Sequence, residues 1–330
     1  MFQAHIIGTG SSAPKRILSN IELEAIVDTS DDWITRRSGI KTRHIASKNE
    51  KESTTDLAAQ ASLKAMEMAG IQSEALDMIV TGTVTPDRQF PSAGCMIQEA
   101  LKANNAAAFD LSAGCSGFLY ALSIANHAIQ IGSCKTALVV GVERLSSIVN
   151  WEDRSTCVLM ADGAGAVVVT SKSESGGILS SHMKSDGSYW DLLYSSYGNS
   201  RTPEILQDVD IKPFFMSMEG NRLFKKAIRC LSSIAIEAME KNNLTSQDIR
   251  LVVPHQANIR IIEGLASSLD IPMEKVYTNI HKYGNTSSAS IPIALDEANR
   301  EGLLKMGDNV LLVSFGAGLT WASTLIRWSI

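Results

Sequence analysis

The sequence predicts an α/β fold made of two similar halves, and two observations lead to that prediction. Apolar runs of four to eight residues alternate with longer segments whose apolar residues recur at helical spacing. This pattern is typical of buried strands in sheets that are covered by helices. Related residues also recur at a constant offset of 173 positions. A period this long indicates a duplicated domain rather than a solenoid.

The elements of the first half follow one another in a regular order. Apolar spacing predicts one helix over residues 55–69 and another over residues 118–131. Short apolar runs at residues 78–81, 106–111 and 136–142 predict buried strands. Helices and strands therefore alternate along the chain, as in interior sheets covered on their faces by helices.

The second half repeats this apolar skeleton. The strand at residues 78–80 returns at 251–253, and that at 138–140 returns at 311–313. Three further matches keep the same offset: Ala65-Met66-Glu67 with Ala238-Met239-Glu240, Ala121-Leu122 with Ala294-Leu295, and Ala125-Asn126 with Ala298-Asn299. We therefore expect an N-terminal half over residues 1–173 and a C-terminal half over residues 174–330. The polar, glycine-containing stretch 172–177 is the expected boundary.

Composition indicates a globular enzyme and argues against several other classes of protein. With 330 residues and 45% hydrophobic side chains, the chain can bury roughly three quarters of its unfolded surface. No apolar run reaches membrane-spanning length, and the net charge of −5 gives no support to nucleic-acid binding. The five cysteines are scattered, with no CxxC pair. We therefore expect no metal site and no disulfide framework, and a cytoplasmic location.

Cys115 is the first candidate for a chemical role. It lies in the stretch DLSAGCSGF, residues 110–118, between a predicted strand and a predicted helix. Unpaired N–H groups and the positive end of the helix dipole favour a thiolate there, so we expect a lowered thiol pKa. Gly114 and Gly117 would let a substrate approach the backbone closely. A lone cysteine in apolar surroundings is more often an inert core residue, so the assignment depends on the second half.

Polar residues appear where the two halves differ. The strand at 251–253 runs into Pro254-His255-Gln256, and Asn285 precedes the counterpart of the helix that follows Cys115. Cys115, His255 and Asn285 therefore all follow strand ends, the edge at which α/β sheets bind ligands. Taken singly, His255 would be a core histidine and Asn285 a turn residue. Together they suit thioester chemistry, in which two neutral donors hold an enolate oxygen while the cysteine carries an acyl group.

Seven motifs run in order along essentially the whole chain: TSDDWI at 29–34 with RSGI at 37–40, FPSA at 90–93, AGCSG at 113–117, DGAGA at 162–166, VPHQAN at 253–258, GNTS at 284–287 and FGAGLTW at 315–321. In these motifs the chain resembles the β-ketoacyl-acyl carrier protein synthase III family of the thiolase superfamily. The resemblance implies a duplicated thiolase-like fold with αβαβα layers.

The resemblance also implies a reaction, which is a decarboxylating Claisen condensation. A short acyl-CoA primer such as acetyl-CoA would react with malonyl-acyl carrier protein to give 3-oxoacyl-acyl carrier protein, CO₂ and CoA, at the start of type II fatty acid biosynthesis. The CoA thioester is then a substrate, and no further cofactor is expected. Which primer is preferred depends on pocket volume, which the sequence does not contain.

Site roles are carried over from the family by position. Cys115 would receive the primer acyl group, while His255 and Asn285 would stabilise the enolate formed when the malonyl thioester loses CO₂. The backbone N–H groups of Cys115 and Ala317 would form the oxyanion hole. The family usually has glycine at the position of Ala317; the methyl group keeps the N–H but narrows the allowed φ and ψ.

Further contacts follow from the same resemblance. Trp33 and Arg154 would sandwich the adenine of CoA, as suits an aromatic face and a planar guanidinium. The other expected CoA contacts are Arg37 and Ser38 at the nucleotide end, and Gly220, Phe224 and Asn258 along the pantetheine tunnel. Phe90 would reach into the acyl pocket of the neighbouring subunit, which implies a homodimer.

The sequence itself, apart from the family resemblance, shows a stripe of basic residues. Arg222, Lys225, Lys226 and Arg229 fall at i, i+3, i+4 and i+7 of a predicted helix in an otherwise acidic protein, and the family places Arg260 near the same mouth. A solvated helix face is the ordinary meaning of such a stripe. Because acyl carrier proteins are strongly acidic, the stripe also fits a docking surface for the malonyl carrier.

Several alternatives within the fold are less consistent with the sequence. A degradative thiolase needs a second cysteine in the loop at residues 314–321, which has none. Elongating synthases use two histidines where this chain has His255 and Asn285. Hydroxymethylglutaryl-CoA synthases add a glutamate as acid and base, and Glu143 lies on the wrong strand for that role. A condensing enzyme or acyltransferase of secondary metabolism remains open.

Two further classes of protein fit the sequence less well. Residues 8–13, GTGSSA, fit a dinucleotide-binding fingerprint, but Pro14-Lys15-Arg16 follows where the fingerprint requires a helix. We therefore expect a turn at residues 8–13 rather than a cofactor loop. A non-catalytic acyl-binding or scaffold protein is disfavoured because Cys115, His255 and Asn285 are all present.

Overall fold

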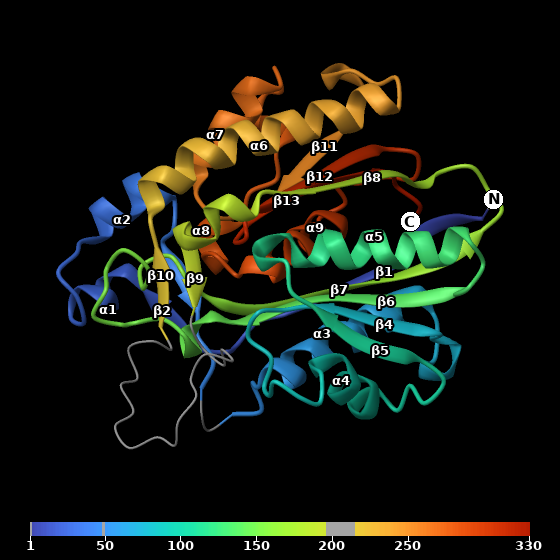
Figure 1. Ribbon diagram of the computed structural model, residues 1–330, viewed down its shortest axis with the longest axis horizontal. Coiled ribbons are helices and arrows are strands. Elements are labelled where there is room, and N and C mark those ends of the chain that lie inside the picture. The colour runs from blue at the N-terminus through green and yellow to red at the C-terminus, as the bar shows by residue number, and fades with distance from the viewer. Residues whose placement is uncertain (1, 48–49, 196–214) are drawn as a thin grey trace.

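The computed structural model describes residues 2–47, 50–195 and 215–330, and two stacked sheets with helices between and outside them form its framework (Figure 1). The first sheet has the order β1-β7-β6-β4-β5: β1 (Gln3–Ser12), β7 (Asp162–Lys172), β6 (Thr136–Arg144), β4 (Met78–Gly82) and β5 (Ala107–Leu111). The second has the order β11-β12-β13-β8: β11 (Leu251–Pro254), β12 (Asn309–Gly316), β13 (Thr320–Arg327) and β8 (Gly177–Ser185).

Helices form the other three layers. Helices α5 (Gly117–Gln130) and α9 (Ser290–Arg300) lie between the sheets, α3 (Thr54–Ala69) and α4 (Ala93–Leu101) cover the first sheet, and α6 (Gly220–Lys241) and α7 (Ile259–Ser268) cover the second (Figure 1). This αβαβα arrangement is the one predicted from the sequence. Smaller elements surround one end: β2 (Ile17–Ser19), α1 (Asn20–Glu24), α2 (Asp31–Ser38), β3 (Thr42–His44), β9 (Leu193–Ser195), β10 (Met216–Met218) and α8 (Ile280–Tyr283).

The two sheets show the duplication directly. In each, a parallel pair is followed by two antiparallel neighbours, so that β4, β6, β7 and β1 correspond to β11, β12, β13 and β8. The counterpart of β5 is reduced to one parallel bridge between Val252 and Val276. The turn from β7 to β8 carries the chain between sheets, and the boundary at 173/174 stays a prediction.

The halves share one hydrophobic core. Its largest cluster contains Phe118 and Leu122 of α5 together with Ile291 and Leu295 of α9, all buried. Burial of these apolar side chains against both sheets removes them from water, which is the main stabilising term in folding. The two central helices therefore hold the ends of both sheets, where Cys115 and Asn285 lie, in one rigid block.

Gly8 and Gly10 do not form the turn expected at residues 8–13. Both lie within the continuous strand β1, against helix α3. A Cβ on either glycine would overlap the carbonyl oxygen of Ala65 or Ala61, respectively. The glycines are explained by this close helix–strand packing, a role that glycine alone can fill. Among the described residues, no helix is long and apolar enough to cross a membrane.

Candidate active site

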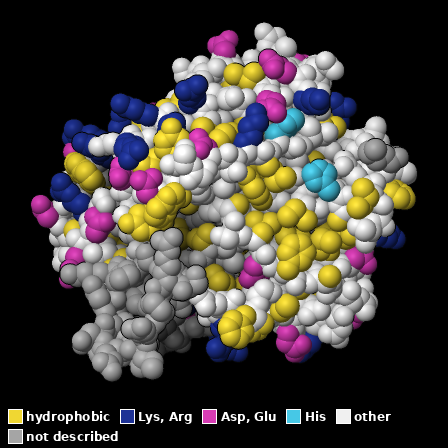
Figure 2. Space-filling view, in the orientation of Figure 1, with side chains coloured by type: hydrophobic (Ala, Val, Ile, Leu, Met, Phe, Trp, Pro, Cys, Tyr) yellow, Lys and Arg dark blue, Asp and Glu magenta, His cyan; other side chains and the backbone are white. Residues whose placement is uncertain are grey.

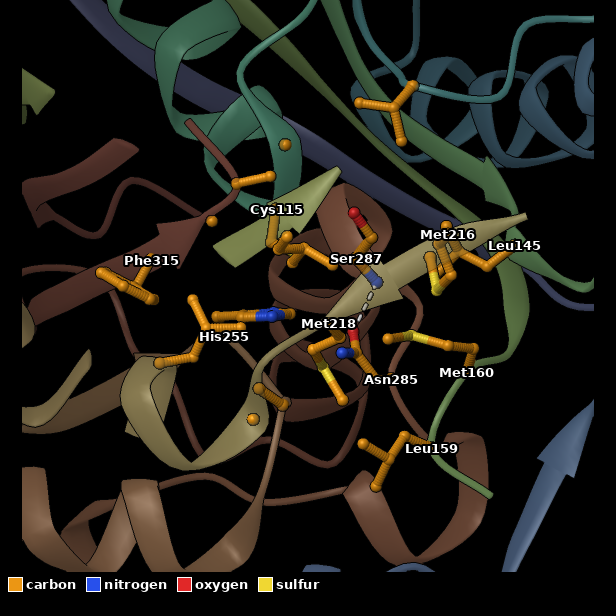
Figure 3. A pocket seen from close by; sticks show the side chains of 18 of the residues that line it. Cys115, Leu145, Leu159, Met160, Met216, Met218, His255, Asn285, Ser287 and Phe315 are labelled. Atoms are coloured by element: carbon orange, nitrogen blue, oxygen red, sulfur yellow. Dashed lines mark hydrogen bonds between the residues drawn. The ribbon is translucent and has the colours of Figure 1, made fainter. Parts of the chain in front are cut away.

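A cavity of about 460 Å³ lies at the carboxyl ends of the central strands, and Cys115, His255 and Asn285 all line it. Cys115 lies in the single 3₁₀ turn Gly114–Ser116 that precedes α5. His255 directly follows β11, and Asn285 follows α8 in the loop that leads to α9. Their side chains point into the same space from three separate segments (Figure 3). The convergence expected from the duplicated plan is thus what the structure has.

Cys115 does not have the lowered pKa that its place before a helix suggested. Burial raises the pKa of the thiol to about 12; a hydrogen bond with the Ser287 side chain opposes the rise, and the charge of Glu143 adds to it. The expectation considered only the helix that follows Cys115. Residues 287 and 315–317, distant in sequence, also line the cavity around the sulfur. Cys115 therefore needs a proton acceptor, because helix placement alone does not ionise it.

His255 is held as a neutral hydrogen-bond donor. Its main-chain N–H donates to Val313 O at 2.8 Å, and its ring Nδ1 lies 2.6 Å from Ser290 Oγ. Ser290 Oγ also accepts from the Gln256 N–H at 3.2 Å, which leaves the Ser290 proton for Nδ1. We therefore assign the ring proton to Nε2, on the pocket side. Burial lowers the pKa of His255 to about 3, so the imidazole stays uncharged at neutral pH.

Asn285 is oriented by its own loop. The main-chain N–H of Ser287 donates to Asn285 Oδ1 at 2.8 Å (Figure 3), which fixes the amide so that Nδ2 is available to the pocket. The Asn285 backbone is anchored to the neighbouring segment, donating to Leu159 O and accepting from the Ala161 N–H. Ser287 adopts the left-handed region with φ +49°, a conformation that a non-glycine residue keeps only when its surroundings hold it.

The backbone around Ala317 supports an oxyanion hole. A Cβ at Gly316 would overlap the Cys115 N–H, and one at Gly114 would lie 2.6 Å from Ala317 N. The two loops therefore touch through their main chains beside the sulfur. Ala317 itself has a φ outside the left-handed region, so its methyl group introduces no backbone strain. Alanine is therefore accommodated without strain at the position where the family usually has glycine.

A second cavity, a surface cleft of about 860 Å³, lies beside the first. Five residues line both: Leu159, Met218, Gly220, Phe224 and Asn258. The cleft and the inner cavity therefore adjoin along these residues. The expected tunnel residues Gly220, Phe224 and Asn258 lie where the two meet.

One end of the cleft holds Trp33, with the guanidinium group of Arg154 close against its ring. Trp33, Arg37, Ser38 and Arg154 all line the cleft. The guanidinium carbons of Arg37 and Arg154 lie 5.4 and 5.2 Å from the centre of the Trp33 ring. An aromatic base between Trp33 and Arg154 needs about 7 Å, twice an ordinary contact distance, so Arg154 must move outward to admit one.

Two of the expected contacts are engaged elsewhere. The Ser38 hydroxyl is buried and donates to Ile34 O at 2.7 Å while it accepts from the Ile40 N–H. Asn258 caps helix α7 through the Arg260 N–H, and its Nδ2 donates to Arg37 O at 2.9 Å. Both residues therefore shape the cleft wall as well as face it.

The residues of the basic stripe do not all line the cleft. Arg222, Lys225 and Arg260 line the cleft, whereas Lys226 stacks over the Tyr189 ring with its Nζ 3.9 Å from the ring centre. Arg229 is exposed further along α6 and does not line the cleft. Lysine and arginine side chains gather over α2 and the start of α6 in Figure 2. Lys226 is thus placed less favourably for docking than its neighbours.

Phe90 lies outside both cavities of its own chain, with 83% of its surface exposed. Its placement leaves it available to a second subunit.

The apolar wall of the inner cavity and the carboxylate behind Cys115 are not evident from the sequence. Leu145, Ile148, Met160, Met216 and Leu223 line the cavity beside the three polar residues, and their spacing in sequence gives no hint of this. Glu143, set aside as lying on the wrong strand, is fully buried at the end of β6 and accepts from Ser287 Oγ at 3.3 Å. The sequence placed Glu143 on its strand, but it did not show that residues 285–288 lie over the end of that strand.

Comparison with known proteins agrees with this geometry. Residues 109–187 match the family described as 3-oxoacyl-[acyl-carrier-protein (ACP)] synthase III, and residues 239–328 match its C-terminal part. The β-ketoacyl-[acyl-carrier-protein] synthase III of Caldanaerobacter subterraneus subsp. tengcongensis is 51% identical, with 99% of this chain and 98% of the relative covered. The chain belongs to the β-ketoacyl-[acyl-carrier-protein] synthase III family.

Solved structures of the family share the fold. The synthase III of Aquifex aeolicus superposes with a TM-score of 0.92 at 48% identity, covering 98% of this chain and 100% of the other. The priming β-ketosynthase from the R1128 polyketide biosynthetic pathway has a TM-score of 0.93 at 36% identity, covering 99% and 96%. The thiolase-like αβαβα fold is thus common to synthases with different pathway assignments.

Proposed function

We propose that this synthase III condenses a short acyl-CoA primer, acetyl-CoA in the first instance, with malonyl-acyl carrier protein. The products are 3-oxoacyl-acyl carrier protein, CO₂ and CoA, and the reaction begins type II fatty acid biosynthesis. The observation that carries the proposal is the meeting of Cys115, His255 and Asn285 in a cavity joined to a cleft lined by Trp33 and Arg154.

Primer loading uses the sulfur and the adjoining backbone. The CoA nucleotide lies in the outer cleft with its pantetheine arm passing Gly220 and Phe224, so that the thioester carbonyl reaches Cys115. The backbone N–H groups of Cys115 and Ala317 bind the oxyanion of the tetrahedral intermediate. CoA leaves, and the acyl group stays on the cysteine against the apolar wall formed by residues such as Leu145 and Met160.

Condensation uses the two neutral donors. Nε2–H of His255 and Nδ2–H of Asn285 hold the malonyl thioester oxygen as CO₂ leaves and an enolate forms. Both groups are uncharged, so neither forms an ion pair with the malonyl carboxylate. Such an ion pair would stabilise the starting material rather than the transition state. The enolate carbon then attacks the acyl group on Cys115.

The partners follow from the same surfaces. The malonyl carrier docks on the basic face formed by Arg222, Lys225, Arg229 and Arg260, with a smaller contribution from Lys226. The active form is a homodimer, in which the exposed Phe90 completes the partner's acyl pocket; burying such a side chain stabilises association by about 2–3 kcal/mol. The enzyme acts in the cytoplasm and needs no cofactor beyond the CoA substrate.

The test is intact mass with peptide mapping after incubation with acyl-CoAs of rising chain length. Acylation of Cys115, and its absence in Cys115→Ala, is the expected result, and the acyl group that loads fastest identifies the primer. If no acyl-CoA modified the enzyme, the proposal would be wrong.

A role in secondary metabolism is not favoured. Relatives that are 47–51% identical carry the synthase III name, whereas the polyketide priming synthase is 36% identical.

A further inference from the structure

Glu143 is a fully buried carboxylate without an ion-pair partner among the described residues. Its oxygens accept from the Val84 N–H at 3.1 and 3.2 Å, from Thr85 Oγ1 at 2.5 Å and from Thr83 Oγ1 at 3.4 Å. Burial raises the pKa of Glu143 to about 7 in spite of these donors. A group of this kind exchanges protons near neutral pH.

Ser287 connects this carboxylate to the nucleophile. Its hydroxyl donates to Glu143 Oε1 at 3.3 Å, and Ser287 lines the inner cavity together with Cys115, where its side chain lowers the thiol pKa against the effect of burial. The left-handed backbone at Ser287, with φ +49°, goes together with an N–H that holds Asn285. A hydroxyl can accept a proton on one lone pair and give up its own, so Ser287 can pass a proton between the thiol and the carboxylate.

The other titratable groups near this strand end are engaged elsewhere. Asp162 on β7 accepts hydrogen bonds from Ala46 and Ser146. The positive charge of Arg144 favours the ionised form of Asp162. Asp110 on β5 accepts from the amides of Ala93 and Gly94, and Asp87 accepts from Thr54 and Thr55. His255, across the cavity, resists protonation because it is buried. Glu143 is hydrogen-bonded to Ser287, which lines the inner cavity together with Cys115.

We propose that Glu143 takes up the Cys115 proton through the Ser287 hydroxyl during primer loading and returns it when condensation releases the cysteine. The inference rests on the proposed function and gives its first step a base.

The step balances as follows. As the sulfur lone pair forms the S–C bond to the primer carbonyl, the S–H proton moves to Ser287 Oγ and the Ser287 proton moves to Glu143 Oε1. The tetrahedral intermediate expels CoA as a thiolate, which takes a proton from solvent. In condensation the enolate carbon forms the C–C bond, the Cys115 C–S bond breaks, and the thiolate recovers the stored proton from Glu143 through Ser287.

The experiment follows single-turnover acylation of Cys115 by acetyl-CoA, read by intact mass between pH 5.5 and 9. In the unaltered enzyme the rate should rise as Glu143 ionises and then level off. Glu143→Gln keeps the shape but cannot accept a proton, and should load about 100-fold more slowly near pH 7. Its rate should rise about tenfold per pH unit, because only the thiolate formed in solution equilibrium then reacts.

Two serine variants separate the path from the fold. Ser287→Ala removes the hydroxyl but keeps the N–H that holds Asn285, and should reproduce the loss and the pH profile of Glu143→Gln. Ser288→Ala is the matched control, because the neighbouring Ser288 hydroxyl is equally buried but donates to Gly82 O; it should load at nearly the unaltered rate.

Decarboxylation of malonyl carrier protein is the second readout. It uses His255 and Asn285, so it should stay within about threefold of the unaltered enzyme in Glu143→Gln. An unchanged loading rate and pH profile in Glu143→Gln would overturn the relay. So would equal losses of loading and decarboxylation, which would mean a general disturbance of the pocket. Failure of the unaltered enzyme to load any acyl-CoA would instead reject the proposed function itself.

Discussion

Ser290 Oγ lies 2.6 Å from Nδ1 of His255 and accepts the Gln256 N–H from its other side. The serine hydroxyl is thereby left to donate to the imidazole, which keeps the histidine proton on Nε2. Removing the Ser290 hydroxyl in Ser290→Ala should lower the rate of malonyl decarboxylation about tenfold. ¹⁵N chemical shifts of the ring would report a mixture of tautomers in the variant and one tautomer in the parent. An unmixed Nε2–H form in Ser290→Ala would show that another group sets the proton position.

Asn285→Ala should affect the two half-reactions unequally. Its amide contacts the developing enolate, so decarboxylation and condensation should fall about 100-fold or more. Loading of Cys115 by acetyl-CoA should fall by only a few-fold, since the oxyanion of that step is held by backbone N–H groups. Separate assays of loading by mass and of CO₂ release test this. If loading were lost while CO₂ release was preserved, the assignment of Asn285 to the enolate-forming step would be wrong.

Charge reversal at Arg229 should separate the two substrates. Arg222, Lys225 and Arg260 line the cleft that we propose for CoA, so their variants should affect both thioesters, whereas Arg229 lies outside it. Arg229→Glu should raise the KM for malonyl carrier protein about threefold to tenfold at low salt and leave the KM for acetyl-CoA unchanged. Lys241→Glu, at the far end of the same helix, is the control. Equal effects of the two variants would remove Arg229 from the docking surface.

The stability of the fold should depend on pH through two buried groups whose effects have opposite signs. The folded pKa of His255 is about 3 against 6.5 for the free side chain. Between these values the unfolded chain alone binds the proton, so stability rises with pH. The folded pKa of Glu143 is about 7 against 4.5; there the folded chain alone retains the proton, so stability falls as pH rises.

The two effects oppose each other between pH 4.5 and 6.5. Urea unfolding of His255→Gln across this window should show stability falling with pH relative to the parent, by roughly 1 kcal/mol per pH unit. Glu143→Gln should show the opposite slope relative to the parent. Curves parallel to the parent in both variants would contradict the assigned protonation states.

The α/β class, the duplicated plan and the three polar residues of the site could be predicted from sequence because they depend on local pattern, whereas the αβαβα layers were implied by the family resemblance. Strands and helices have their own periods, and the 173-residue offset brings His255 and Asn285 to positions equivalent to strand ends near Cys115. The motifs of the family added Trp33 and Arg154, which the structure places together in the lining of the outer cleft; their role in CoA binding stays a prediction.

What the sequence did not show depends on contacts between distant segments. The thiol pKa of Cys115 was predicted in the wrong direction because its burial depends on residues about 170 and 200 positions away. Ser290 and Glu143 were missed for the same reason, since neither lies near its partner in sequence. The glycines of β1 looked like a turn because the helix they pack against begins more than 40 residues later.

The five residues shared by the outer cleft and the inner cavity have a kinetic consequence. In the proposed reaction both thioester arms pass the place where Gly220, Phe224 and Asn258 line the cleft and the cavity alike. An arm already inside excludes a second one, so CoA must depart before the carrier arm enters. Turnover then alternates between a free and an acylated enzyme, and double-reciprocal plots for the two substrates run parallel. High concentrations of malonyl carrier should slow the reaction, because the carrier arm then occupies the passage before a primer has been loaded.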